Sequence, residues 1–109
     1  MMKGMDKQGG THSVTVWNDG DGSWLITVVG EIDLSTASEL TNAINRALAG
    51  APREVVFDLS GVRFMDSSAL AAMVTVPAGG MQVSVRSASH VARRVIEISG
   101  LAETLGLDS

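Results

Sequence analysis

The hydrophobic pattern at the start of the chain predicts a β-hairpin. Residues 13–16 and 24–29 are short runs rich in Val, Ile, Thr and Trp, a composition that favours extended strands. Between them, residues 18–22 (Asn-Asp-Gly-Asp-Gly) have the composition of a tight turn. Residues 1–12 are polar and Gly-rich, and we expect a flexible N-terminal tail there, ahead of a single domain at residues 13–109.

A helix is predicted next, because apolar side chains recur at helical spacing over residues 36–49. The apolar positions are Ala37, Leu40, Ile44, Ala47 and Leu48. Thr36 and Glu39 have the spacing of a capping box, in which each side chain bonds the backbone N–H of the other residue. Gly50 and Pro52 are expected to end this helix.

The second half of the chain alternates strands and helices. A strand buried on both faces is predicted at residues 55–59, followed by a turn at Ser60-Gly61. A helix should begin at residues 66–68 and be stopped by Pro77 and by the glycines at 79–80, and a half-exposed strand follows at residues 81–86. The last predicted helix is capped by Ser89, has an apolar face of Val91, Val95 and Ile98, and ends at Gly100. This alternation predicts an α/β fold, a mixed central sheet of four to five strands with helices packed against it.

Composition and charge exclude several classes of function. The chain has no Cys, which excludes disulfides, thiolate metal sites and thiol nucleophiles. The formal net charge of −4 gives no basic surface for nucleic acid or an anionic membrane. Residues 69–78, the longest mostly apolar stretch, are too few to cross a bilayer, and residues 1–10 lack the apolar core of a signal peptide. We expect a cytoplasmic protein without nucleic-acid partner or membrane insertion.

No motif in the chain predicts catalysis or metal binding. His12 and His90 have no second ligand at metal spacing. A triad of Ser67, His90 and an aspartate is compatible with chain order, but no nucleophile turn or oxyanion device accompanies it. Residues 18–22 resemble a calcium loop only superficially, because Glu31 does not fall in the register that an EF-hand needs. We therefore expect no enzyme activity, no metal, no cofactor and no small-molecule substrate.

Residues 58–70 (Asp-Leu-Ser-Gly-Val-Arg-Phe-Met-Asp-Ser-Ser-Ala-Leu) contain the most distinctive pattern of the chain. They predict a buried strand, a tight turn, an apolar anchor and a polar helix start. Asp66, Ser67 or Ser68 can cap that helix by accepting a hydrogen bond from an early backbone N–H. Phe64 is expected to pack in the core.

The same segment resembles the signature of bacterial anti-sigma factor antagonists, which belong to the STAS family. That signature is Asp-Leu-Ser-x-Val-x-Phe-Met-Asp-Ser-Ser/Thr-Gly-Leu. Residues 30–33 (Gly-Glu-Ile-Asp) followed by residues 36–37 (Thr-Ala) match a second family motif, and residues 99–101 (Ser-Gly-Leu) match the end of the family's third helix. The resemblance covers residues 13–107 and implies a STAS-type fold.

The resemblance also implies a protein-binding switch. Family members bind an anti-sigma factor that is a serine kinase of the GHKL type, and so release a sigma factor. The kinase phosphorylates the serine after the signature aspartate and a serine phosphatase removes the phosphate; ATP belongs to the kinase, and no cofactor to this chain. That serine is Ser67 here, with Ser68 as the alternative that the residues alone leave open. The implied partner-binding residues are Asp33, Met65, Asp66, Ser67 and Ser68.

Phosphorylation at this position has a simple physical effect. It adds roughly −1.5 to −2 charges and three acceptor oxygens. A helix N-terminus favours an anion, so we expect the fold to survive while the binding surface changes its charge. A hundredfold loss of affinity needs only about 2.8 kcal/mol. An unfavourable charge facing a desolvated interface can supply that amount.

The chain departs from the family pattern at two places. Ala69 replaces the usual Gly, a change that a helix tolerates. The stretch from Ser67 to Gly80 is shorter than usual, and residues 75–77 (Thr-Val-Pro) remove the polar second half of the helix that helps to dock the partner. This shortening leaves open an alternative function, a stand-alone STAS adaptor subunit of a membrane transport complex.

Overall fold

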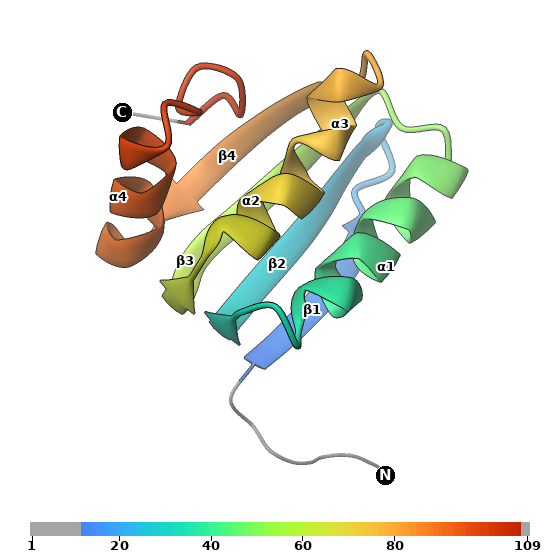
Figure 1. Ribbon diagram of the computed structural model, residues 1–109. Helices are drawn as coiled ribbons and strands as arrows, with labels where there is room; N and C mark the ends of the chain where they lie inside the picture. The colour runs from blue at the N-terminus through green and yellow to red at the C-terminus, as the bar shows by residue number, and fades with distance from the viewer. Residues whose placement is uncertain (1–11, 108–109) are drawn as a thin grey trace, which may run out of the picture.

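The computed structural model describes residues 12–107, which form one mixed sheet with helices packed against it (Figure 1). The elements, in chain order, are β1 (His12–Asn18), β2 (Ser23–Ile32), α1 (Ala37–Ala49), β3 (Glu54–Met65), α2 (Ser67–Met73), α3 (Thr75–Ala78), β4 (Gln82–Ala88) and α4 (His90–Ile98). The sheet order is β1-β2-β3-β4. β1 is antiparallel to β2, whereas β2, β3 and β4 run parallel. The predicted α/β class with a mixed central sheet is confirmed.

The predicted hairpin is present, and its turn is closed by side chains. The Asn18 Oδ1 atom accepts a hydrogen bond from the Gly20 N–H at 2.9 Å, and Asp21 Oδ1 accepts one from the Ser23 N–H at 2.9 Å. β1 begins at His12, one residue earlier than expected. The remainder of the predicted tail, residues 1–11, lies outside the described residues.

The core lies between one face of the sheet and the helices. Ile26, Phe57 and Val85 stand in register on neighbouring strands and are at most 1% exposed. Figure 1 shows α1, α2 and α3 over the same face of the sheet, and α4 adds Ala92 and Ile96 to the same core. The opposite face, here called the open face, carries alternate side chains that are half-buried or exposed, including Leu25, Thr27, Val56 and Asp58. The expectation that residues 55–59 are buried on both faces is therefore wrong.

β3 continues through the predicted turn at Ser60-Gly61 and contains two irregularities. Its pairing with β2 shifts by one residue between Thr27 and Val29 and again between Gly30 and Glu31. Each shift places an extra residue in β3, which is the property of a β-bulge. The successive core positions Leu59, Val62 and Met65 are therefore three positions apart in the chain, instead of the two positions of a regular strand. As a result Met65 faces the core, and Phe64, expected inside, is 47% exposed.

The second predicted helix is divided in two. α2 ends at Met73, and Pro77 lies inside the short helix α3 instead of ending the first helix. A proline lacks an N–H group and its ring clashes with the carbonyl four residues earlier, which belongs to Met73. The helix therefore breaks where that carbonyl lies. The Thr75 hydroxyl donates to the Ala72 carbonyl oxygen at 2.7 Å and stabilises the break.

Two further helix predictions differ from the structure in detail. Ser89 caps α4 as expected, since its Oγ accepts a hydrogen bond from the Ala92 N–H at 3.1 Å. The buried face of α4 is formed by Ala92 and Ile96, however, and Ile98 is 73% exposed. Gly50 ends α1 with an ordinary φ of −83°, and its lack of a side chain is required because a Cβ would overlap the ring of Trp24. Within the described part of the chain, no helix is both long and apolar enough to cross a membrane.

The bulges predict opposite effects of two neighbouring substitutions. Met65→Ala removes a buried side chain and should lower the free energy of unfolding by about 2–5 kcal/mol. Phe64→Ala removes an exposed ring and should lower it by less than about 1 kcal/mol. Urea unfolding followed by circular dichroism measures both. Equal losses, or a larger loss for Phe64→Ala, would contradict the assigned register.

Candidate functional site

The carboxyl ends of β2 and β3 meet at one pole of the molecule. Ile32 and Met65 are paired, and the Asp66 N–H donates a hydrogen bond to the Ile32 carbonyl oxygen at 3.3 Å. Figure 1 shows β2 and β3 ending side by side, and Asp33 and Asp66, the residues that follow these strands, therefore lie at the same pole. Parallel strands produce this juxtaposition, because both deliver their chain exits to the same edge.

Asp66 is the residue that caps α2. Its backbone is extended, with φ −123° and ψ −170°, and its Oδ1 atom accepts a hydrogen bond from the Ser68 N–H at 2.9 Å. The Asp66 carbonyl oxygen also accepts from the Ala69 N–H at 3.1 Å. Of the three residues that could cap the helix from sequence alone, the aspartate does so.

Ser67 is left as an exposed residue at the first turn of α2. Among the described residues, its hydroxyl makes no hydrogen bond, and in particular none joins it to His90. Ser68 is half-buried, and Ala69 and Leu70 are buried beneath the turn. Accessibility to an enzyme therefore favours Ser67 over Ser68.

An apolar groove of about 560 Å³ begins beside Ser67. Its apolar walls are formed by Leu70, Ala71, Val74, Pro77, Ala78 and Leu101, and its polar rim by Ser67, Ser99 and Thr104. The break between α2 and α3 places Pro77 and Ala78 in the wall. The segment that departs from the family pattern thus forms part of the surface around Ser67.

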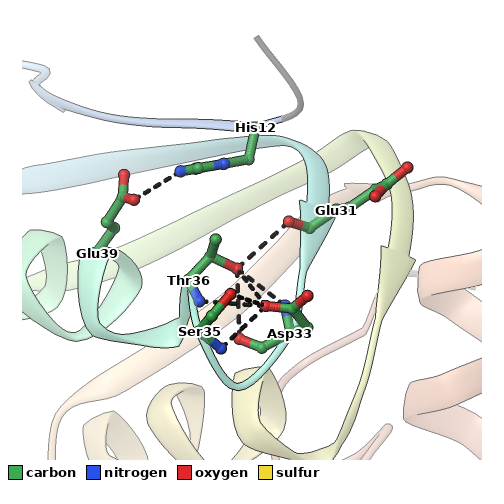
Figure 2. Close-up of polar contacts among 6 residues, drawn as sticks. All are labelled: His12, Glu31, Asp33, Ser35, Thr36 and Glu39. Carbon is green, nitrogen blue, oxygen red and sulfur yellow. Dashed lines mark hydrogen bonds and ion pairs between the residues drawn. The ribbon is translucent and has the colours of Figure 1, made fainter. Parts of the chain in front are cut away.

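Asp33 organises the turn between β2 and α1. Its Oδ1 atom accepts hydrogen bonds from the Ser35 hydroxyl at 2.7 Å, from the Ser35 N–H at 2.9 Å and from the Thr36 N–H at 3.2 Å (Figure 2). In return, the Thr36 Oγ1 atom accepts from the Asp33 N–H at 2.9 Å. The hydrogen bond from the Ser35 hydroxyl is the largest cause that lowers the Asp33 pKa below 3.8, and it outweighs partial desolvation.

This turn replaces the predicted capping box. The Thr36 side chain does not cap α1, and the Glu39 carboxylate lies 2.6 Å from the His12 Nε2 atom instead of reaching back to residue 36 (Figure 2). The predicted capping box is therefore wrong, because the Thr36 hydroxyl is hydrogen-bonded to Asp33 in the turn that precedes α1.

The side chains at the pole differ from the predicted set in two ways. Met65 is 4% exposed and packs in the core, so it does not present its side chain to a partner as expected. Leu34, which sequence reasoning missed, is 79% exposed beside Asp33. Its signal in the sequence is a single large apolar residue inside the polar run Asp-Leu-Ser-Thr, a position that no core pattern requires.

No cluster of three or more His, Cys, Asp or Glu side chains suited to a metal ion occurs within residues 12–107. The carboxylates of Asp33 and Asp66 instead accept hydrogen bonds from neighbouring backbone and hydroxyl groups, whereas Ser67, Leu34 and the groove are accessible.

Comparison with known proteins gives consistent matches. The family model described as "Mlab, STAS domain" matches residues 19–107. The anti-sigma-F factor antagonist RsfB of Mycobacterium tuberculosis is 36% identical over 94 residues, which cover 84% of this chain and 77% of that protein.

Solved structures show the same fold. A crystal structure of an anti-sigma factor antagonist from Mycobacterium paratuberculosis superposes with a TM-score of 0.77 at 31% identity, covering 92% of this chain and 87% of that one. The anti-sigma factor antagonist SpoIIAA in its unphosphorylated form gives a TM-score of 0.73 at 19% identity and covers 89% of each chain. SpoIIAA in its phosphorylated form gives 0.61 at 20% identity, covering 89% of this chain and 92% of that chain.

The cap geometry predicts different effects of neighbouring substitutions. Asp66→Ala removes the acceptor of the Ser68 N–H and should lower the free energy of unfolding by about 1 kcal/mol. Ser67→Ala removes a hydroxyl without a described partner and should change it by less than about 0.5 kcal/mol. Chemical denaturation of the two variants tests this, and a cap located at Ser67 would reverse the order.

The lowered pKa of Asp33 predicts a specific loss of stability in acid. Its folded-state pKa lies below 3.8, so the ionised carboxylate stabilises the fold fully above pH 3.8, and this contribution disappears as the pH falls through the folded pKa. Asp33→Asn should therefore lose less stability than the unsubstituted chain between pH 5 and about pH 2. Urea titrations across that range measure the difference. Parallel curves for the two proteins would exclude this contribution from Asp33.

Proposed function

This chain belongs to the STAS domain family, and on that premise we propose that it is an anti-sigma factor antagonist whose binding is ended by phosphorylation of Ser67. The observation that carries the proposal is the position of the Ser67 hydroxyl. It is exposed, it follows the capping residue Asp66, and it lies at the rim of an apolar groove. The names of the relatives at 36% and 31% identity support the general role.

The partner that we propose is an anti-sigma factor that also acts as an ATP-dependent serine kinase of the GHKL type. Such an enzyme needs a hydroxyl that enters its active site without local unfolding, and Ser67 meets that requirement. A separate serine phosphatase would restore the binding form. In this proposal the chain is a binding protein and a substrate of the kinase, and it has no catalytic role of its own.

Phosphorylation would alter binding more than folding. The Ser67 hydroxyl has no hydrogen bond to another described residue, and Asp66 rather than Ser67 holds the start of α2. A phosphate would add its charge next to Asp66 in the chain, at the pole that also holds Asp33, and at the edge of a groove that a partner must desolvate. Covering that charge with apolar surface is unfavourable, and about 2.8 kcal/mol suffices for a hundredfold loss of affinity.

The remaining exposed groups at the pole would complete the interface. Leu34 offers a large apolar side chain in a turn that Asp33 holds in place through its hydrogen bonds to residues 35 and 36. We assign Asp33 the role of a positioning residue for this turn. Leu34 and the groove beside Ser67 would then anchor the partner from two sides.

Capture of the partner tests the proposal. The unsubstituted chain, Ser67→Ala, Ser67→Asp and Ser87→Asp are immobilised, incubated with a lysate of the source organism, and analysed by mass spectrometry. Ser87 is exposed on β4 away from the groove, so its variant controls for added charge. We expect each protein except Ser67→Asp to capture a GHKL-type anti-sigma factor. For Ser67→Asp the captured amount should fall at least about tenfold, a smaller loss than for phosphoserine because a carboxylate carries less charge than a phosphate.

Equal capture of transport-complex subunits by all four proteins would contradict the proposal and favour the adaptor function. The captured kinase is then incubated with ATP and each protein, and the modified residue is located by peptide mass spectrometry. Phosphate should appear on Ser67 in the unsubstituted chain and in Ser68→Ala, and be absent from Ser67→Ala. Transfer to Ser68 would assign the switch to the other serine.

A further inference from the structure

β1 forms an edge of the sheet whose backbone groups are regularly arranged. The Asp19 N–H donates to the Ser23 carbonyl oxygen at 2.9 Å, in the same register as the β1–β2 pairs. Backbone groups of an antiparallel strand point to alternate sides. The odd-numbered residues of β1 therefore direct their N–H and C=O groups toward β2. Val14 and Val16 direct theirs toward the outer edge, where no described strand pairs with them.

The two edges of the sheet differ. At the β4 edge, residues 106 and 107 lie against the strand: the Val85 N–H donates to the Gly106 carbonyl oxygen at 3.0 Å, and Val85 and Leu107 form a parallel bridge. At the β1 edge, the described residues provide no such cover. Edge strands usually carry Lys, Pro or a bulge that prevents pairing. β1, with the sequence His-Ser-Val-Thr-Val-Trp-Asn and an uninterrupted register, has none of these.

The sequence of β1 is also complementary to itself in an antiparallel arrangement. A twofold axis at Thr15 places Val14 opposite Val16 of a second copy, so the outward backbone groups of both strands meet as hydrogen-bonded pairs. Thr15 then faces its own copy across the axis. Trp17, which is 66% exposed, lies opposite Ser13 of the second copy on the open face. Threonine pairs and aromatic contacts of this kind stabilise neighbouring strands.

We propose that two copies of this chain associate through β1, and so form one continuous sheet across the dimer. This interface lies at the opposite end of the strand order from β4, near which the groove residues Ser99 and Leu101 are found. Both Ser67 sites stay accessible in such a dimer. The proposal does not depend on the proposed function, since it rests only on the edge strand.

Charge at the twofold axis tests the proposal. Thr15 is exposed in the single chain, so Lys or Glu should be tolerated there, but in the dimer two like charges would face each other. One strand pair buries less surface than a standard interface, and we expect a Kd of about 0.1 mM. Sedimentation equilibrium up to about 1 mM chain should show a weight-average mass that rises with concentration toward twice 11.3 kDa, reaching about 1.8 times that mass at about 1 mM for the unsubstituted protein. Thr15→Lys and Thr15→Glu should each raise the Kd at least about tenfold, and an equal mixture of the two should restore association.

Amide hydrogen exchange supplies the second readout. Exchange at Val14 and Val16 should slow as the concentration rises, whereas Thr15 and Trp17 are protected by β2 at every concentration. Thr41→Lys, an exposed position on α1, is the matched control and should associate like the unsubstituted chain. A monomer at about 1 mM would overturn the proposal. So would a dimer that both Thr15 variants leave unchanged, or one that slows exchange at other residues only.

Discussion

The hydrogen bond between the Asp66 carboxylate and the Ser68 N–H is the interaction on which the candidate site depends. It fixes the start of α2 directly after the last core residue of β3. Because the aspartate caps the helix, the serine between the two partners is free of that structural task. One residue thus secures the fold while its neighbour remains available to a partner. In the proposed switch, this separation would let phosphorylation of Ser67 change the surface while the helix stays capped.

The parallel sheet gives this local arrangement its wider context. β2 and β3 end side by side, so the turn held by Asp33 and the cap held by Asp66 lie together although 33 positions separate them in sequence. The interruption after Met73 then folds Pro77 and Ala78 back along the groove. A surface with an exposed leucine, an exposed serine and an apolar groove results from these three features.

The sequence predicted the fold well where a pattern is local. The hairpin, the alternating strands and helices that follow it, and the Ser89 cap are predicted from turn composition and periodicity, and all are present. It failed where register decides the outcome. The bulges of β3 cannot be recognised from the order of apolar residues. For this reason Phe64, predicted in the core, is exposed, and Met65, predicted to face a partner, is buried. The Thr36–Glu39 spacing is compatible with a capping box. In the structure, however, the Thr36 hydroxyl accepts a hydrogen bond from the Asp33 N–H and does not cap α1.

The candidate site was predicted mainly through the resemblance of residues 58–70 to a known signature. Physical reasoning alone left Asp66, Ser67 and Ser68 as equivalent caps, and the structure distinguishes them by their hydrogen bonds and exposure. Leu34 was missed because an exposed apolar residue has no periodic signal. Its exposure follows from the turn that Asp33 holds through its hydrogen bonds to residues 35 and 36.

The central claim is that charge on Ser67 changes binding and leaves the fold intact. The most direct test uses a chain that carries phosphoserine at position 67, prepared by genetic-code expansion. Its free energy of unfolding and its affinity for the purified anti-sigma factor are measured on the same sample. The account predicts a change in unfolding free energy within about 0.5 kcal/mol. It also predicts a loss of affinity of about hundredfold, equivalent to about 2.8 kcal/mol. Unchanged affinity, or a domain that unfolds on modification, would contradict it.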